Sequence, residues 1–360
     1  MIPFFWNFGT IISNLIVLYK SLKLPNSNGG NKMEDTNVVE LYEWLDEATT
    51  VIQQQMDEPY LEGLTIALEA LFYNDAPEGL NDIVSKKLTE ALEEIDLETK
   101  STLTIRKAIQ LAVLKGMKDA TQYNHMITPE TISMFIGYLA EKLTEKQDTV
   151  RVFDPVSGTA NLLLIVLDHL KKDTAAYASE IDATLLQLAL LNANLQKKRV
   201  EYFHQDSLRP FLLDPVDLVV ADLPVGYYPD DAHAAGFELN ADEGHAFAHH
   251  LLIEQSLHYT KEGGYLIFVI PEFLFQSEQA DKLHAFIQKH AHIIGLLQLP
   301  DTAFQSEDHK KSIFILRKKG EDTKDVQQPL LAMLPSFKDT GAMENVLVKI
   351  NQWFEQTDLA

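Results

Sequence analysis

The feature that most constrains this sequence is an alternation of short β-branched runs with helical stretches, which begins after Thr128-Pro129. Such alternation predicts a mostly parallel, Rossmann-like α/β sheet with helices on both faces. A sheet of this kind binds its ligand beyond the carboxyl ends of its strands. We predict seven strands, at residues 150–153, 175–179, 200–204, 218–221, 265–270, 293–299 and 312–316.

Acidic residues follow each of the first four predicted strands, and they include Asp154, Glu180, Asp206 and Asp222. One acid after a strand is most simply a helix cap or a solvated turn residue. Four in succession indicate a shared site. The loop after the first strand has neither a G-x-G-x-x-G pattern nor the Lys-Ser/Thr of a P-loop, and the acids would repel phosphates. They suit a ligand with a cationic centre, hydroxyls and an amino group, as in S-adenosylmethionine.

The composition limits the partners and the compartment. The net charge is −23, and residues 34–100 alone carry a balance of −15, which speaks against indiscriminate binding to phosphate backbones. A nucleic-acid partner therefore needs a local basic face or a separate subunit. The absence of cysteine excludes disulfides, thiolate metal sites and a cysteine nucleophile, and it fits a reducing compartment, so we expect a cytoplasmic protein.

The chain divides into four predicted parts. Residues 1–32 are expected to be a disordered or non-native extension, with Met33 as the start of translation; a membrane anchor and an ordered element are the alternatives, and we expect no stable membrane association. Residues 33–120 show helical periodicity and predict a small all-α domain of about four helices. Residues 121–320 form the predicted catalytic domain, and 321–360 a C-terminal extension.

Within residues 120–319 the sequence resembles class I methyltransferases. The likeness is strongest to amino-methylating DNA adenine methyltransferases related to type I modification subunits, and a group of Firmicute proteins described as adenine-specific methyltransferases shares the string D-L-P-V-G-Y-Y-P. The matching segments are Asn124 to Ile132, Asp154 to Leu163, Glu180-Ile-Asp182, Gly263 to Pro271, Leu299 to Phe304 and Lys311 to Leu316.

The resemblance implies S-adenosylmethionine as the cofactor. Gly158 and Ala160 would lie beneath its methionine part, Glu180 would hold the ribose hydroxyls, and Asp206 would accept from the adenine amino group. Ala160 replaces the family's second glycine, which is tolerable provided that the site does not require a positive φ. The other residues predicted at the cofactor are Thr128, Asp154, Thr159, Asn161, Asp182, Ser207 and Asp222.

The fourth strand end resembles the family's [DN]-P-P-[FY] loop. By that resemblance Asp222 and the Leu223 carbonyl would accept hydrogens of the target amine, and Pro224 would stiffen the loop. Val225 stands where the family has an aromatic ring that stacks on an extruded base. Either Tyr227 or Tyr228 replaces that ring, or both tyrosines pack against the neighbouring helix.

Three functions stay open from the sequence. The first is an adenine amino-methyltransferase acting on DNA, with a specificity partner because no dedicated base-reading domain is visible. The second is a methyltransferase of RNA or of a protein side-chain amide, and the third a non-catalytic regulatory protein that binds the cofactor. We predict no metal site, and a capping or surface role for His245, His249 and His250. The sequence does not define the oligomeric state.

Overall fold

The computed structural model describes residues 32–119, 127–304 and 310–357. The predicted extension therefore lies outside the described residues except for Lys32, as do the predicted boundary at residue 120 and the matching residues 124–126. No helix in the described part is both long and apolar enough to cross a membrane.

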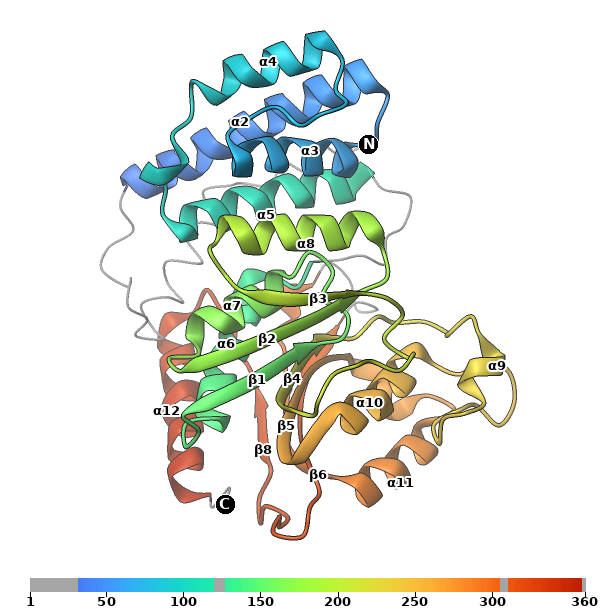
Figure 1. Cartoon of the computed structure of the whole chain (residues 1–360). Helices are drawn as coiled ribbons and strands as arrows, with labels where there is room; N and C mark the ends of the chain where they lie inside the picture. Colours follow the sequence, from blue (N-terminus) through green and yellow to red (C-terminus); the bar gives the residue numbers. More distant parts are fainter. Residues whose placement is uncertain (1–31, 120–126, 305–309, 358–360) are drawn as a thin grey trace.

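The N-terminal part is an all-helical layer, seen at the top of Figure 1. Pro59 immediately precedes its second helix, and the Asn81 side chain caps the third by accepting a hydrogen bond from the Val84 N–H at 3.0 Å. Its apolar faces pack into one core, as the periodicity predicts. The four helices are α2 (Lys32–Met56), α3 (Tyr60–Tyr73), α4 (Asp82–Leu92) and α5 (Thr102–Asp119), with a short 3-10 turn η1 (Leu97–Thr99).

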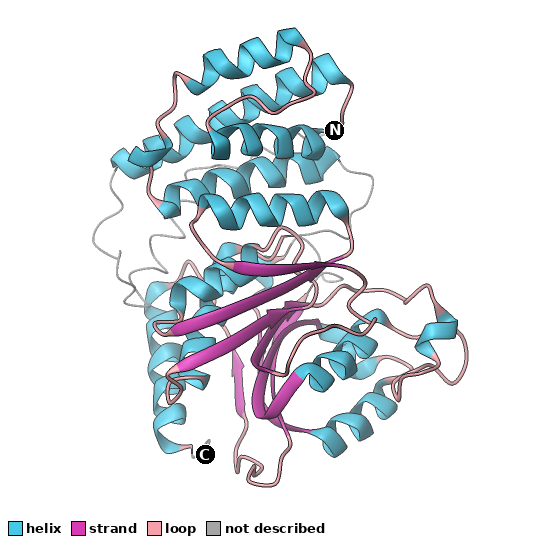
Figure 2. Cartoon of the chain, in the orientation of Figure 1, coloured by secondary structure: helices cyan, strands magenta, loops and turns pink. Residues whose placement is uncertain are grey.

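An eight-stranded sheet forms the second part, in the order β3-β2-β1-β4-β5-β7-β6-β8. Figure 2 shows its strands in magenta among the helices. The first five strands in this order are parallel, and β7 runs antiparallel between β5 and β6. The strands are β1 (Thr149–Asp154), β2 (Asp173–Glu180), β3 (Val200–His204), β4 (Val216–Asp222), β5 (Thr260–Pro271), β6 (Ala291–Gln298), β7 (Lys311–Lys318) and β8 (Leu330–Met333).

Helices cover both faces of the sheet, and alternate strand residues face each core. On one face lie α6 (Glu130–Leu143), α7 (Asn161–His169) and α12 (Thr340–Gln356). On the other face lie α10 (Ala248–Tyr259) and α11 (Ala280–His290). The smaller elements are α9 (Asp231–Ala234) and the 3-10 turns η2 (Glu272–Gln276) and η3 (Asp301–Ala303). These layers confirm the predicted α/β sheet with helices on both faces, preceded by a helical domain.

The sheet has one strand more than the seven predicted. The additional strand, β8, pairs in parallel with β6, and α12 packs behind it through Met343, Leu347 and Ile350. Residues 321–357, expected as part of an extension, therefore contribute to the sheet and its core. β8 is only four residues long and half exposed, so it carries no strong local strand signal.

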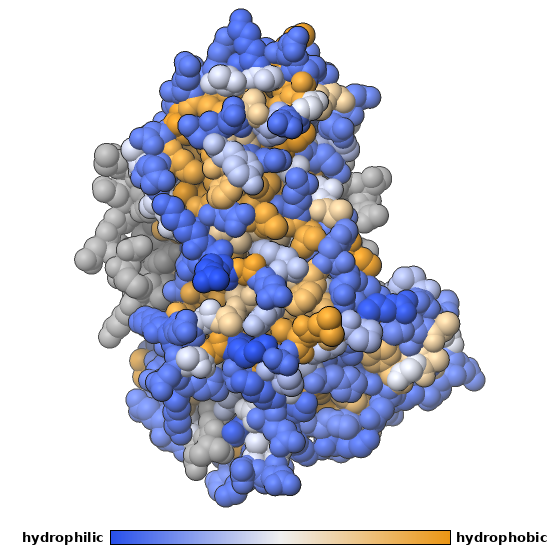
Figure 3. All heavy atoms as spheres, in the orientation of Figure 1, coloured by the Kyte–Doolittle hydropathy of each residue, from blue (hydrophilic) through white to orange (hydrophobic). Residues whose placement is uncertain are grey.

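Helix α8 (Ala183–Leu195) joins the two parts of the molecule, as Figure 1 shows. Its leucines enter the core of the helical layer, while Ala189 and Ala193 pack against Ala160 and Leu164 of the sheet domain. The helix is therefore apolar on two sides. On the face shown in Figure 3, polar residues predominate around the edges, and apolar residues gather over the helical layer and the middle of the molecule.

Candidate functional site

Three of the four predicted carboxylates meet at the carboxyl edge of the parallel strands. Asp154 ends β1, Glu180 ends β2 and Asp222 ends β4, and these strands are neighbours in the sheet. Asp154 is almost completely buried. Burial, opposed by a hydrogen bond from the Val156 N–H and assisted by the charges of Glu180 and Asp222, raises the pKa of the Asp154 carboxyl to about 8. A cationic ligand bound beside Asp154 would therefore favour the ionised form of its carboxyl.

The loop after β1 brings its backbone close to Glu180. Gly158 has φ 53° and its N–H donates to Glu180 Oε2 at 2.8 Å, and a Cβ at Gly158 would meet nothing within 4 Å. Ala160 has φ 61°, so the condition under which alanine replaces the second glycine without strain is not met. Its methyl group is nonetheless accommodated, because it packs against Leu164 and Ala189.

Backbone N–H groups hold the Glu180 side chain at the end of β2. Glu180 Oε1 accepts hydrogen bonds from the N–H groups of Ile181 and Asp182, both at 2.9 Å. Asp182 is exposed, and its side chain caps α8 by accepting from the Leu185 N–H at 2.9 Å. Glu180 thus points back over the Gly158 loop, whereas Asp182 acts as a helix cap.

Four further residues predicted at the cofactor are polar supports in the structure. The Asn161 amide donates to the Thr128 carbonyl at 2.9 Å, and the Thr128 hydroxyl donates to Asp222 Oδ2 at 2.9 Å. The Thr159 carbonyl accepts from the Asn192 side chain at 3.0 Å. The Ser207 hydroxyl donates to the Pro155 carbonyl, which ties the end of β3 to the loop after β1.

Asp206 lies after β3, beside this loop, and both of its oxygens accept hydrogen bonds. Oδ1 accepts from the Leu208 N–H at 2.9 Å, and Oδ2 accepts from the Tyr228 hydroxyl at 2.5 Å. Arg209 lies 3.8 Å from the same carboxylate. The contact with Tyr228 joins the third strand end to the segment that follows the fourth.

Asp222 has a partner that the sequence analysis missed. The Lys311 ammonium lies 2.5 Å from Asp222 Oδ1, and both side chains are largely buried. Lys311 begins β7 opposite Pro271 of β5, so antiparallel pairing places it near the end of β4. The lysine opening the predicted last strand was a visible signal, but only the pairing of β5 with β7 reveals its partner. The Leu223 N–H donates to the Val269 carbonyl at 3.0 Å and fixes the loop to β5.

The two candidate tyrosines have different surroundings. Tyr227 is 56% exposed and stacks on Phe247, with ring centroids 4.8 Å apart and an interplanar angle of 13°. Tyr228 is only 7% exposed. Val225, at the family's aromatic position, is itself partly exposed. Of the two tyrosines, Tyr227 therefore presents the more accessible ring.

The predicted surface or capping role is wrong for two of the three histidines. His249 and His250 are fully buried in α10, and Phe247, not a histidine, occupies the position before that helix. Burial lowers the pKa of His249 to about 4 and that of His250 to about 3, so both are neutral at pH 7. His245 is exposed and lies 2.9 Å from Asp231. The histidine pattern misleads because α10 is buried on nearly all sides.

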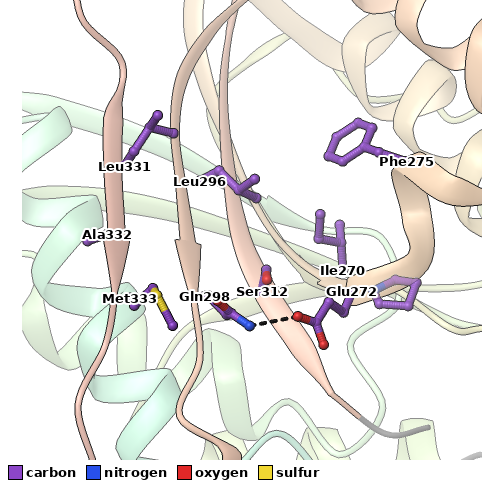
Figure 4. A pocket seen from close by; sticks show the side chains of 10 residues that line it. Ile270, Glu272, Phe275, Leu296, Gln298, Ser312, Leu331, Ala332 and Met333 are labelled. Atoms are coloured by element: carbon purple, nitrogen blue, oxygen red, sulfur yellow. Dashed lines mark hydrogen bonds between the residues drawn. The ribbon is translucent and has the colours of Figure 1, made fainter. Parts of the chain in front are cut away.

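A separate cavity of about 390 Å³ lies between the ends of β5, β6, β7 and β8 (Figure 4). Leu296, Leu331 and Met333 supply apolar surface, and Gln298 donates to Glu272 Oε1 at 2.6 Å across it. None of the residues predicted for the cofactor or the acceptor lines it, and neither lysine nor arginine is among its lining residues.

Comparisons with known proteins agree with this architecture. Residues 39–117 match the family model described as the YtxK N-terminal helical domain, and residues 115–341 match the model for N-6 DNA Methylase. The Bacillus subtilis protein YtxK is 47% identical over 327 residues, which cover 90% of this chain and 99% of the relative.

Solved structures give the same result. A Listeria monocytogenes protein, provisionally assigned to the class I S-adenosylmethionine-dependent methyltransferases, superposes with a TM-score of 0.84 at 42% identity, covering 89% of this chain and 99% of that chain. The methyltransferase subunit of a Streptococcus thermophilus type I restriction-modification system has a TM-score of 0.60 at 12% identity, covering 96% and 87%, and shows a shared fold. The chain belongs to the N-6 DNA methylase family of methyltransferases, whose cofactor is S-adenosylmethionine.

Proposed function

We propose that this chain transfers a methyl group from S-adenosylmethionine to the exocyclic amino group of adenine in DNA. The observation that carries this proposal is the meeting of Asp154, Glu180 and Asp222 at one edge of the sheet, with Asp206 beside them. The family assignment supports the reaction class. The acceptor and the residue roles are our inference from the contacts.

The residues present fit the proposed cofactor. Asp154 lies in a buried acidic cluster that favours a cation, and the space above Gly158 is open. In the proposed complex Glu180 holds the ribose hydroxyls and Asp206 accepts from the adenine amino group. Thr159, Asn161, Asp182 and Ser207 maintain the surrounding backbone. When bound, the cofactor supplies an electrophilic methyl group on a sulfonium.

At the acceptor, this chain has to orient a weak aromatic amine. Asp222 and the Leu223 carbonyl would accept its two hydrogens and so direct the nitrogen lone pair. Lys311 and Thr128 hold the Asp222 carboxylate in place, and each of its oxygens keeps a second lone pair for the amine. Because Val225 offers no ring, we assign base stacking to the exposed Tyr227.

Recognition of a DNA sequence is proposed to need a specificity partner. Two basic clusters, Lys197-Lys-Arg199 and Arg317-Lys-Lys319, already make internal contacts. Lys198 pairs with Asp168 at 2.5 Å, and Lys318 donates to the Thr260 carbonyl at 2.7 Å. The net charge of −23 opposes sequence-independent attraction to phosphates. A separate basic subunit would supply that attraction and the base contacts.

Transfer of labelled methyl groups to adenine-containing DNA tests this proposal. Asp222→Ala should abolish transfer, because no carboxylate orients the amine, while the affinity for S-adenosylhomocysteine, which lacks the sulfonium charge, changes little in calorimetry. Asp214→Ala is the matched control, since that aspartate is 89% exposed at its side chain and lies outside the site. Unchanged transfer by Asp222→Ala would show that our catalytic assignment is wrong.

A second candidate, a non-catalytic protein that binds the cofactor, is favoured by two departures at the fourth strand end. Val225 replaces the stacking ring, and the Lys311 ammonium already contacts Asp222. Such a protein would bind S-adenosylmethionine in calorimetry but transfer no label to pools of DNA, RNA or protein. Label in the RNA or protein pool alone would instead identify another acceptor.

A further inference from the structure

Tyr228 links the two halves of the proposed site, and its backbone is fixed on both sides. Its N–H donates to the Ala246 carbonyl at 2.8 Å, and the Gly226 carbonyl accepts from the Ala248 N–H at 2.9 Å. Tyr227 and Phe247 form an antiparallel bridge between these two bonds. Residues 226–228, which follow the loop from Asp222 to Val225, are therefore held against the start of α10. This attachment defines the direction of the Tyr228 ring.

The Tyr228 hydroxyl ends at Asp206. It donates to Oδ2 at 2.5 Å, while the Leu208 N–H donates to Oδ1 at 2.9 Å, so the two bonds together fix the carboxylate plane. Burial and the neighbouring Asp206 raise the pKa of Tyr228, so its hydroxyl keeps the proton at neutral pH. Each carboxylate oxygen retains a lone pair that can accept another hydrogen bond.

The burial of Tyr228 argues against the stacking role considered from the sequence. Its side chain is 7% exposed, and its ring makes an edge contact with His233 at a centroid distance of 6.3 Å. A flipped base needs an open ring face. The exposed Tyr227 satisfies this requirement. Tyr228 instead contacts Asp206, which is proposed to bind the adenine of the cofactor.

We infer that Tyr228 is a positioning residue that orients Asp206 toward the 6-amino group of the cofactor's purine and thereby sets the preference for adenine. This inference rests on the proposed function, because it takes Asp206 as the acceptor for that amino group. The hydrogen bond from Tyr228 to Asp206 also connects the segment after the Asp222 loop directly to the residue proposed to bind the cofactor's adenine. A site that accepts a hydrogen bond from an amino group discriminates against a ligand that lacks it.

Calorimetry on the full chain, with two ligands, tests the inference. The probes are S-adenosylhomocysteine and its analogue with hydrogen in place of the 6-amino group. Tyr228→Phe removes one oxygen atom and leaves the ring in place. We expect it to weaken binding of the amino ligand about five- to tenfold and to change binding of the analogue less than about twofold. The affinity ratio of the two ligands should therefore fall by about the same factor.

Two further variants separate this role from general loss of packing. Tyr138→Phe deletes a comparable hydroxyl, which donates to the Asn351 side chain at 2.9 Å outside the site, and should leave both affinities unchanged. Asp206→Asn should lower the same ratio, and the double variant with Tyr228→Phe should lower it no further than Asp206→Asn alone. Melting temperatures of all variants report on folding.

The outcomes distinguish the inference from the function on which it rests. An unchanged ratio in Tyr228→Phe, or equal weakening of both ligands, would overturn the positioning role. If Tyr228→Phe does not fold, the ratio in Asp206→Asn decides, and a wild-type ratio there would also overturn it. If the wild-type protein binds neither S-adenosylhomocysteine nor S-adenosylmethionine, it is the proposed cofactor site that fails.

Discussion

At the scale of single residues, the loop after β1 contains two positions with positive φ that differ in their surroundings. Gly158 faces open space, whereas the methyl group of Ala160 is buried between α7 and α8. An L-residue in the left-handed region carries strain of about 1 to 2 kcal/mol. The chain bears this strain at Ala160 and gains packing there, but the open space at Gly158 would offer a side chain no packing.

Substitutions at these two positions should therefore separate stability from binding. Gly158→Ala should cost about 1 to 2 kcal/mol of unfolding free energy through backbone strain, and should weaken S-adenosylmethionine binding by at least about tenfold because a methyl group enters the proposed methionine subsite. Ala160→Gly should change the unfolding free energy by less than about 1 kcal/mol, since relief of strain offsets the lost methyl contacts. Chemical denaturation and calorimetry measure both quantities. Tight binding by Gly158→Ala would place the cofactor elsewhere.

Some of these residues could be predicted from the sequence, and others could not. Asp154, Glu180 and Asp222 follow directly from the rule that parallel strands carry ligands at their carboxyl ends. The contacts of Tyr228 with Asp206, and of Lys311 with Asp222, join residues 22 and 89 positions apart in the chain. Such contacts depend on loop paths and on antiparallel pairing, for which local periodicity has no signal.

At the scale of secondary-structure elements, Arg106 of α5 connects the helical layer to the sheet domain. Its guanidinium lies 3.3 Å from Glu130 at the start of α6 and also pairs with Asp168 of α7. Arg106 and Glu130 are nearly completely buried. Charges in such a position stabilise only as a set, because the loss of one partner leaves the others desolvated.

Arg106→Met should therefore destabilise the protein strongly. We expect a loss of about 3 to 5 kcal/mol in the free energy of unfolding, because Glu130 loses its buried cation. Lys86→Met is the control: its ion pair with Glu90, at 3.7 Å, is exposed and should contribute less than about 1 kcal/mol. Urea denaturation measures both variants. A similarly small loss of unfolding free energy in both variants would show that the ion pairs of Arg106 do not hold the helical layer against the sheet domain.

The histidines of α10 should make the protein sensitive to acid. The folded-state pKa of His250, about 3, lies below its unfolded value of 6.5 because of burial, with His249 adding to the effect. The stability associated with a neutral His250 is present above pH 6.5 and is lost as the pH falls toward 3. His250→Phe should therefore lose less stability than the wild type between pH 6.5 and 4.5.

Denaturation at these two pH values checks this expectation, with His245→Phe as the exposed control. Equal losses in the wild type and His250→Phe would contradict the effect of burial. The helix also shows why histidine spacing gave a wrong surface prediction. A helix packed on nearly all sides shows no polar face from which the burial of a given histidine could be judged.

At the scale of the whole molecule, the fold was largely accessible from the sequence, because strands and helices alternate with clear periodicity over the sheet domain. The strand that escaped prediction, β8, lies at the sheet edge and depends on its pairing with β6. The packing of α8 against both the helical layer and the sheet domain could not be predicted either, because an apolar helical sequence does not show which elements the helix contacts. What the sequence predicted best is thus the part of the structure governed by local periodicity.

The molecule as a whole also concentrates negative charge where the proposed cofactor binds. The folded-state pKa of Asp154, about 8, lies above the unfolded value of 3.8. Its contribution to folding stability is therefore present below pH 3.8 and is lost as the pH rises through 8. A bound cation favours the ionised carboxylate, so binding should release a proton below pH 8 and strengthen as the pH rises toward that value.

The most direct test of the shared acidic site is a calorimetric titration of the full chain with S-adenosylmethionine at pH 6.5 and pH 8.5, for the wild type and Asp154→Asn. We predict that the dissociation constant of the wild type falls, relative to that of Asp154→Asn, by roughly tenfold between these pH values. Asp154→Asn corrects for titration of the ligand itself. Absence of binding, or the same pH dependence in both proteins, would contradict the account.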